Sequence, residues 1–288
     1  MITFSEIAAQ GYTKRKFKNR LMCLLFFVAA LVALTPLFSI MGYVFIKGVG
    51  SINWSFLTQL PAPVGESGGG MANALVGTCV LIVLASIIGM TSGLATGIYL
   101  SEYGRGKLAT IIRFSADMLS SVPSIVIGLF VYILIVRPMQ SFSALAGGVA
   151  LGVIMIPTIA RSAEELLKLV PASVREAGLA LGLPRWKVTI WIVLKGSLSG
   201  IITGVMLAIA RVAGETAPLL FTALGNRFWS WNLTQPIGSL PVQIFTYSIS
   251  PFEEWHRQAW AGALVLVLLV FSINLGARFV FRPQISRD

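Results

Sequence analysis

Arg211 and Glu215 are charged residues in an otherwise apolar stretch, where charge is costly. At about 1.5 Å per residue, Arg211 lies roughly 24 Å along a helix from Lys195, too deep for the nearer membrane surface. A buried arginine in such a segment usually faces a bundle interior or a watery cavity and marks a pathway. Its planar guanidinium binds oxyanions in a bidentate way and stays charged. Glu215, one turn on, can hold it in place; the alternative is that the two residues pair only with each other or with a partner helix.

A second segment, residues 171–196, mixes basic and apolar residues. Ser173 and Glu176 have the spacing of a capping box, which satisfies free N–H groups at a helix start. Gly182 followed by Pro184 is typical of a helix end. The pattern predicts a helix of about two turns, a sharp turn and a second helix. A short helix across the mouth of a bundle suits docking onto another protein, although an ordinary loop with a helical turn fits the same residues.

The elements that position these residues are membrane spans. The 288 residues are 56% hydrophobic and 11% charged, with a mean hydropathy of +0.83, as in integral membrane proteins. A signal peptide is the competing interpretation of the first apolar run. That run is about 26 residues long, too long for a signal h-region, and residues 38–41 offer no small-residue cleavage site. We therefore expect a retained span, kinked near Pro36.

The predicted fold class is an all-α membrane protein with six transmembrane helices. The third span carries Ser121, Pro123 and Ser124 near its middle, and Gly214 and Pro218 are expected to break the outer end of the fifth. The predicted spans are residues 21–46, 72–100, 111–136, 144–160, 190–224 and 259–281, the last five forming a permease core at 72–283. Between and around them lie a basic N-terminus (1–20), two outer loops (47–71 and 225–258), a coupling segment (161–188) and a tail (284–288).

Basic residues predict the orientation of the six spans. Sixteen Lys and Arg residues fall on the side that holds both termini and the coupling segment, and four fall on the other side. The positive-inside rule places the richer side in the cytoplasm. The net charge of +11 therefore reflects membrane topology rather than a nucleic-acid surface.

Two further charged residues in or near the spans, Asp117 and Lys195, have local explanations. Asp117 follows Arg113 at i+4, so a local ion pair near the inner surface is predicted. Lys195 can extend toward the inner surface from the start of the fifth span.

Residues that could support catalysis or hold a metal are lacking. Gly106-Lys107 is followed by Leu108 and has no P-loop spacing, so ATP is not expected to bind here. Cys23 and Cys79 fall in apolar spans and are expected to pack there. His256 has no partner pattern, and no nucleophile–base set can be assembled. We expect neither an enzyme nor a metal or cofactor site.

The coupling segment resembles the EAA loop of ABC-transporter permeases, Glu-Ala-Ala-x3-Gly-x9-Ile-x-Leu-Pro. The matching residues are Glu176-Ala177-Gly178, Gly182 and Ile192-Val193-Leu194, with Gly178 and Lys195 replacing the second Ala and the final Pro. The replacements predict some loss of helix propensity and a less kinked start to the next span. In that family the segment is a coupling helix that docks in a groove of a cytoplasmic ATPase. The resemblance assigns coupling to Arg175, Glu176, Ala177, Gly178, Leu181 and Gly182.

Other stretches are similar to the PstA-type permeases of phosphate importers, from about residue 70 to 280. They are Arg211-Val-Ala-Gly-Glu-Thr-Ala-Pro-Leu, Ser121-Val-Pro-Ser-Ile-Val-Ile-Gly-Leu-Phe130, Ile156-Pro-Thr-Ile-Ala-Arg-Ser-Ala-Glu-Glu165 and Ser239-Leu-Pro-Val-Gln-Ile-Phe245. The resemblance implies import of inorganic phosphate through the type I ABC importer permease fold. It assigns the substrate pathway to Arg211, Glu215, Thr216, Ser121 and Ser124, with Arg161 at its cytoplasmic end or, equally, as a positive-inside anchor.

The same resemblance implies a heterotetramer in the bacterial inner membrane. This chain would pair with a homologous PstC-type permease above two PstB-type ATPase subunits, which bind the ATP, and a periplasmic phosphate-binding protein would deliver the cargo. Two alternatives stay open: a permease for another oxyanion such as sulfate or molybdate, including the sister permease, or an ion-coupled secondary transporter or channel. The latter would need no EAA spacing and no ATPase.

Overall fold

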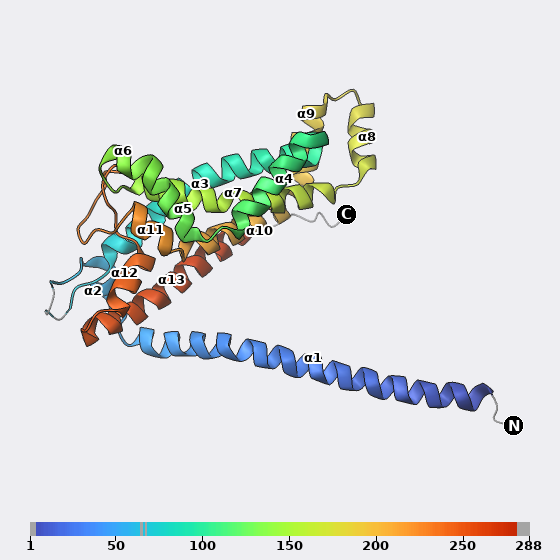
Figure 1. Ribbon diagram of the computed structural model, residues 1–288, viewed down its shortest axis with the longest axis horizontal. Helices are drawn as coiled ribbons and strands as arrows, with labels where there is room; N and C mark the ends of the chain where they lie inside the picture. Colours follow the sequence, from blue (N-terminus) through green and yellow to red (C-terminus); the bar gives the residue numbers. More distant parts are fainter. Residues whose placement is uncertain (1–3, 64–65, 67, 281–288) are drawn as a thin grey trace.

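The structure is a computed structural model that describes residues 4–63, 66 and 68–280. All regular elements of these residues are helical, which confirms the predicted fold class (Figure 1). In chain order they are α1 (Phe4–Val49), α2 (Trp54–Thr58), α3 (Ala72–Ile98), η1 (Tyr99–Tyr103), α4 (Gly106–Ser121), α5 (Ser124–Val131), η2 (Tyr132–Val136), α6 (Arg137–Met139), α7 (Ala144–Lys168), α8 (Ala172–Ala180), α9 (Arg185–Lys187), η3 (Val188–Val193), α10 (Leu194–Ala213), α11 (Ala217–Thr222), α12 (Leu240–Ser248) and α13 (Glu253–Val280), where η1, η2 and η3 are π-helical.

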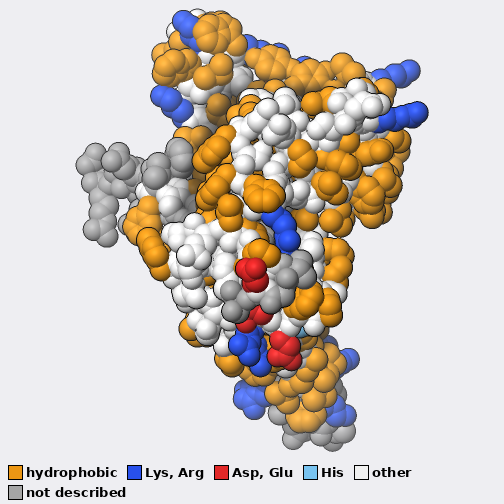
Figure 2. Space-filling model, turned by 90° about the vertical axis from the view of Figure 1, so that its left-hand side faces the viewer, with side chains coloured by type: hydrophobic (Ala, Val, Ile, Leu, Met, Phe, Trp, Pro, Cys, Tyr) orange, Lys and Arg blue, Asp and Glu red, His pale blue; other side chains and the backbone are white. Residues whose placement is uncertain are grey.

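Five helices among the described residues are long and apolar enough to cross a membrane. Helix α4 and the limb α5–α6, bent by 104° relative to each other, give a sixth span when the pair is counted as one. Hydrophobic side chains accordingly cover much of the surface when the molecule is viewed from the end opposite α8 (Figure 2). The bend corrects the expectation of one uninterrupted third span, and its physical origin is described below.

Helix α1 extends away from the bundle (Figure 1). It runs without a break through Pro36, so the expected kink does not interrupt it. Its C-terminal end packs closely on α13, where a Cβ placed on Gly48 would lie 2.8 Å from the Cβ of Leu264. None of the residues in its most apolar 18-residue stretch is buried. The described part of this chain therefore leaves the apolar surface of α1 uncovered except near its C-terminal end.

The centre of the bundle is a close packing of α3 against α7. Glycines recur every four residues along α3 and meet side chains that recur every four residues along α7. Cβ atoms placed on Gly89, Gly93 and Gly97 would lie 2.6, 2.8 and 2.6 Å from the Cβ atoms of Met155, Ile159 and Ala163, respectively. Small residues at this spacing let two helix backbones approach closely, as is typical of membrane helices.

Helix α10 packs on another side of α7, again through glycines spaced four residues apart. Cβ atoms placed on Gly200 and Gly204 would lie 2.8 Å from Leu166 Cδ2 and 2.6 Å from Ser162 Cβ. Ser143 caps the start of α7 with its hydroxyl. The N–H of Ser143 donates to the carbonyl of Thr222 at the end of α11, and that of Ala144 donates to the carbonyl of Gln235 in the long loop, each at 3.0 Å. Helix α7 is thus the element around which α3 and α10 are assembled.

Several helix limits differ from those predicted. Helix α7 continues to Lys168, eight residues beyond the expected end of the fourth span. The outer loop at 225–258 contains α12, whose first N–H, that of Leu240, donates to the buried hydroxyl of Thr78 at 2.8 Å. The predicted tail, residues 284–288, lies outside the described residues.

Candidate functional site

The third span is broken where Ser121-Val-Pro-Ser was noted in the sequence. Helix α4 ends at Ser121, whose hydroxyl donates to the carbonyl of Met118 at 2.8 Å, and α5 begins at Ser124. Pro123 between them cannot donate a backbone hydrogen bond and disfavours helical geometry at the residue before it, which accounts for the 104° bend. Irregular backbone of this kind at membrane depth is tolerated where it is enclosed by protein or lines a water-filled cavity.

The fifth span is broken as the sequence predicted. Helix α10 ends at Ala213, with Gly214 as its C-cap, and Pro218 lies in the first turn of the short helix α11. Helix α11 packs on α5, and a Cβ placed on Gly128 would lie 2.6 Å from the Cα of Pro218. The outer limbs of two broken spans are therefore in contact with each other.

Arg211 and Glu215 flank the second break. Arg211 is in the last turn of α10, and its Nε lies 3.9 Å from the Glu215 carboxylate. The side chain of Arg211 is 46% exposed and that of Glu215 is 18% exposed, so the chain by itself does not enclose the guanidinium. A groove of about 640 Å³ between α10 and α13 is lined by Gly214 at the same break, together with Asn274 and Arg278. The long ion-pair distance leaves the donors of Arg211 available to an anion.

The coupling segment forms the predicted short helix, α8, which stands at one end of the bundle (Figure 1). It ends as expected, because Gly182 has a φ of +77°, in the left-handed region that favours glycine. The predicted capping box is wrong: the helix starts at Ala172 with Pro171 as N-cap, so Ser173 falls inside the first turn. The following span, Arg185–Ala213, begins with the single α-helical turn α9 and passes through the π-helical η3 before the regular helix α10.

Comparisons with known proteins assign the chain to a family. Residues 93–283 match the family "Binding-protein-dependent transport system inner membrane component". The chain is 48% identical over 283 residues to the phosphate transport system permease protein PstA of Yersinia pestis, covering 98% of this chain and 96% of that protein. The chain belongs to the PstA permeases. PstA of Haemophilus influenzae is 44% identical over 272 residues, covering 94% and 96% of the two chains.

A solved structure supports the fold of this PstA-family chain. In an inward-facing MetNI methionine ABC transporter, a chain with 20% sequence identity superposes with a TM-score of 0.61, covering 74% of this chain and 96% of the other. At this identity the likeness concerns the fold alone, and it confirms the permease fold that the EAA resemblance implied. A PstA permease is a membrane-spanning transport subunit and not an enzyme.

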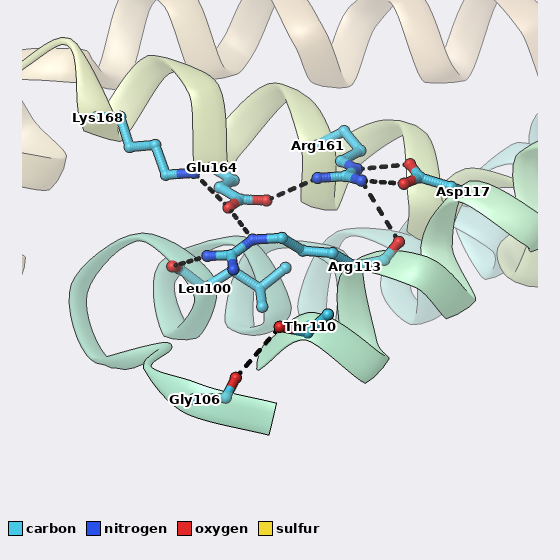
Figure 3. A network of polar contacts seen from close by, with 8 residues as sticks. All are labelled: Leu100, Gly106, Thr110, Arg113, Asp117, Arg161, Glu164 and Lys168. Carbon is cyan, nitrogen blue, oxygen red and sulfur yellow. Dashed lines mark hydrogen bonds and ion pairs between the residues drawn. The ribbon is translucent and has the colours of Figure 1, made fainter. Parts of the chain in front are cut away.

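A cluster of charged residues joins α4 to the C-terminal half of α7 in this PstA permease (Figure 3). Glu164, whose side chain is 1% exposed, accepts hydrogen bonds from Arg113 Nε at 2.6 Å, Lys168 Nζ at 2.5 Å and Arg161 Nη1 at 3.2 Å. Arg161 also donates to Asp117, with Nε 2.9 Å from Oδ1. Three cations thus surround two carboxylates, and each carboxylate takes a charge-assisted hydrogen bond from the other helix.

The pairing inside this cluster differs from the prediction. Asp117 pairs with Arg161 on α7, and Arg113 pairs with Glu164, so the predicted local Arg113–Asp117 pair is wrong. The i, i+4 rule describes ion pairs on the surface of one isolated helix and leaves out partners on a facing helix. Glu164 was not singled out in the sequence, although a glutamate between two cations at i−3 and i+4 is a readable signal. Arg161 lies in this cluster with its side chain 30% exposed, held by two carboxylates.

The predicted site residues therefore form two groups. Ser121, Ser124, Glu215, Thr216 and Arg211 flank the two helix breaks, and the hydroxyl of Ser121 is occupied by its own helix. Arg161 belongs instead to the cluster around Glu164. On α8 and just after it, Glu176, Ala177 and Leu181 are exposed, whereas Arg175 and Gly178 are turned toward the bundle.

Proposed function

We propose that this chain is the membrane permease subunit of an ATP-driven importer of inorganic phosphate. Two full-length relatives named as phosphate transport permeases support the cargo. The single observation that carries a role in the pathway is Arg211, a half-exposed guanidinium at a helix break inside a membrane span. Discontinuous helices near the bilayer midplane are a common way to build a transport site, because they place unpaired backbone groups and charges beside the cargo.

A homologous second permease is proposed to complete the site. Because Arg211 is not enclosed by this chain, a neighbouring subunit must shield it from lipid and supply the facing wall. The guanidinium fork would bind two phosphate oxygens, while Glu215 would remain close enough to compete for it and so keep binding reversible. Such a partner, two cytoplasmic ATPases and a periplasmic binding protein are the parts that an importer of this kind requires.

Helix α8 is proposed to receive the motion of an ATPase. Its exposed side chains, including Glu176, Ala177 and Leu181, provide the docking surface, and the basic residues at this end favour a cytoplasmic location by the positive-inside rule. From α8 the displacement passes to η3, which continues without a break into α10. Because Arg211 lies in the last turn of α10, movement at α8 is delivered along one helix to the proposed phosphate site.

The test is ATP-dependent phosphate uptake by the reconstituted complex, comparing the wild type with Arg211→Gln. Losing a charged hydrogen-bond donor to an anion costs about 1.5–3 kcal/mol, so uptake at subsaturating phosphate should fall at least tenfold. The matched control is Arg257→Gln, because Arg257 forms an equally long 3.9 Å ion pair with Glu254 on the exposed start of α13. Equal uptake in both variants, or competition by sulfate as strong as that by phosphate, would contradict the proposal.

A further inference from the structure

Arg175 holds the coupling helix α8 to the inner end of α3. Its guanidinium makes a forked contact with Glu102 in η1, the π-helical extension of α3: Nη2 lies 2.7 Å from Oε1, and Nε lies 3.2 Å from each carboxylate oxygen. The side chains are 23% and 9% exposed, so the pair is largely shielded from water. A bidentate arginine–carboxylate pair of this kind fixes orientation as well as distance.

The same guanidinium also closes the end of α7. Nη2 of Arg175 donates to the carbonyl of Leu167 at 2.8 Å, and Nη1 donates to the carbonyl of Val170. Carbonyls at the end of a helix have no partner within it, and a basic side chain is a common substitute. One side chain on α8 therefore joins three separate elements: η1, the end of α7 and α8 itself.

The other side of α8 rests on η3 by packing alone. A Cβ placed on Gly178 would lie 2.8 Å from Ile192 Cδ1 and 3.0 Å from Val188 Cγ2, so the helix backbone lies directly on these side chains. Helix α8 is thus held between two π-helical segments, a type of helix irregularity that is frequent at functional sites. Residues on its far side are exposed, as shown by Leu181 at 81%.

The two contacts transmit force differently. Packing of Gly178 on η3 resists approach but offers little resistance to separation, because dispersion contacts are weak and fall off within about an ångström. The ion pair with its backbone hydrogen bonds resists separation as well, because pulling it apart would leave a buried carboxylate unpaired. A displacement of α8 toward the bundle can therefore push η3 and α10, whereas in a displacement away from it Arg175 is the side chain of α8 that holds η1 and so pulls directly on α3.

We propose that the Glu102–Arg175 pair is a positioning contact that pulls α3 when α8 moves away from the bundle. The pair thereby couples this half of the movement of α8 to a rearrangement of the bundle. The proposal rests on the proposed function above, in which an ATPase moves α8. Glu102 contacts neither cargo nor ATPase in this scheme; it acts by keeping α3 attached to α8. Without the pair, the complex would hydrolyse ATP without returning the bundle to its starting arrangement.

The experiment measures phosphate uptake and ATP hydrolysis in the same proteoliposomes containing the whole complex. Glu102→Gln keeps the size of the side chain and removes its charge, and Arg175→Lys keeps the charge and removes the fork and its carbonyl contacts. Each is expected to lower phosphate transported per ATP at least fivefold while ATP hydrolysis stays within twofold of the wild type. Glu165→Gln, an exposed carboxylate on α7 at the same end, is the matched control and should keep the wild-type ratio.

The outcomes separate this inference from the proposed function. If the wild-type complex takes up no phosphate, the proposed function fails. If the wild type transports and the ratio is unchanged in both variants, the positioning role is overturned. A proportional fall in uptake and hydrolysis, or loss of the ATPase subunits from the purified complex in both variants, would make the pair merely structural and would equally overturn it. Normal assembly with an uncoupled ATPase in either variant supports the proposal.

Discussion

Replacing Glu164 with glutamine should destabilise the permease more than its position near the end of a helix suggests. The carboxylate is 1% exposed and accepts hydrogen bonds from Arg113, Lys168 and Arg161 at 2.6, 2.5 and 3.2 Å. Glutamine keeps the size and one acceptor oxygen but leaves the three cations with Asp117 as their remaining carboxylate in the cluster. Removing one member of a buried ion pair typically costs about 3–5 kcal/mol.

The expected cost here is somewhat smaller because the cations can regain water. The side chains of Arg113 and Arg161 are each 30% exposed and that of Lys168 is 51% exposed, which lowers the expectation to about 2–3 kcal/mol. At about 2–4 °C per kcal/mol, this corresponds to a fall of roughly 5–10 °C in the Tm of the purified complex.

The assay is scanning fluorimetry of the purified complex, with Glu165→Gln as the matched control. Glu165 is the next residue on α7 and is exposed, so the same loss of charge there should shift the Tm by less than about 2 °C. The reasoning would be refuted if the two variants melted at the same temperature. A stabilised Glu164→Gln variant would show, further, that burying the carboxylate costs more than its three partners return.

Two further substitutions test the packing and the outer loop. Gly93→Ala should destabilise the complex by about 1–3 kcal/mol, because the new methyl group would lie 2.8 Å from a Cβ on α7. Its control is Gly42→Ala, which has no atom within 4 Å of the new Cβ and should stabilise its helix by about 0.5–1 kcal/mol. The Tm of each variant complex measures the effect, and equal shifts in Tm would contradict the packing argument. Thr78→Val should cost about 1–3 kcal/mol by leaving the first N–H of α12 without its acceptor, as measured by faster hydrogen exchange in α12. Thr91→Val is its control, since the Thr91 hydroxyl donates to carbonyls of its own helix and is exposed; similar exchange in the two variants would exclude the bond from Thr78 as the cause.

The signals of Gly182, Gly214 and Pro218 were read correctly from the sequence. Gly182 ends α8 in the left-handed conformation, and Gly214 with Pro218 ends α10 and opens α11. These residues act on their own segment of chain, so the neighbouring sequence contains all the information needed. The five unbroken spans were predictable for a similar reason, because each is defined by the hydropathy of a continuous stretch.

What the sequence did not reveal depends on facing elements. The partner of Asp117 was predicted on its own helix, but α7 brings Arg161 within reach. Pro123 was noted in the third span, but the sequence did not show that α5 would turn by 104° and lie against α11. Arg175 was placed with the coupling residues by its position, and its forked contact with Glu102 joins residues 73 positions apart. Long-range pairs of this kind cannot be read from one sequence.

The glycine contacts on both sides of α7 make α3, α7 and α10 a single rigid unit, which can act as a lever. Where backbones touch, no free volume remains for one helix to slide along another, so a force applied at α8 tilts the three helices together. The 25 residues of α7 make this lever about 37 Å long. A tilt of about 5° at the α8 end then displaces the opposite end by about 3 Å, comparable to the width of a water molecule. In the proposed mechanism, a small movement of α8 is therefore enough to open or close a narrow passage.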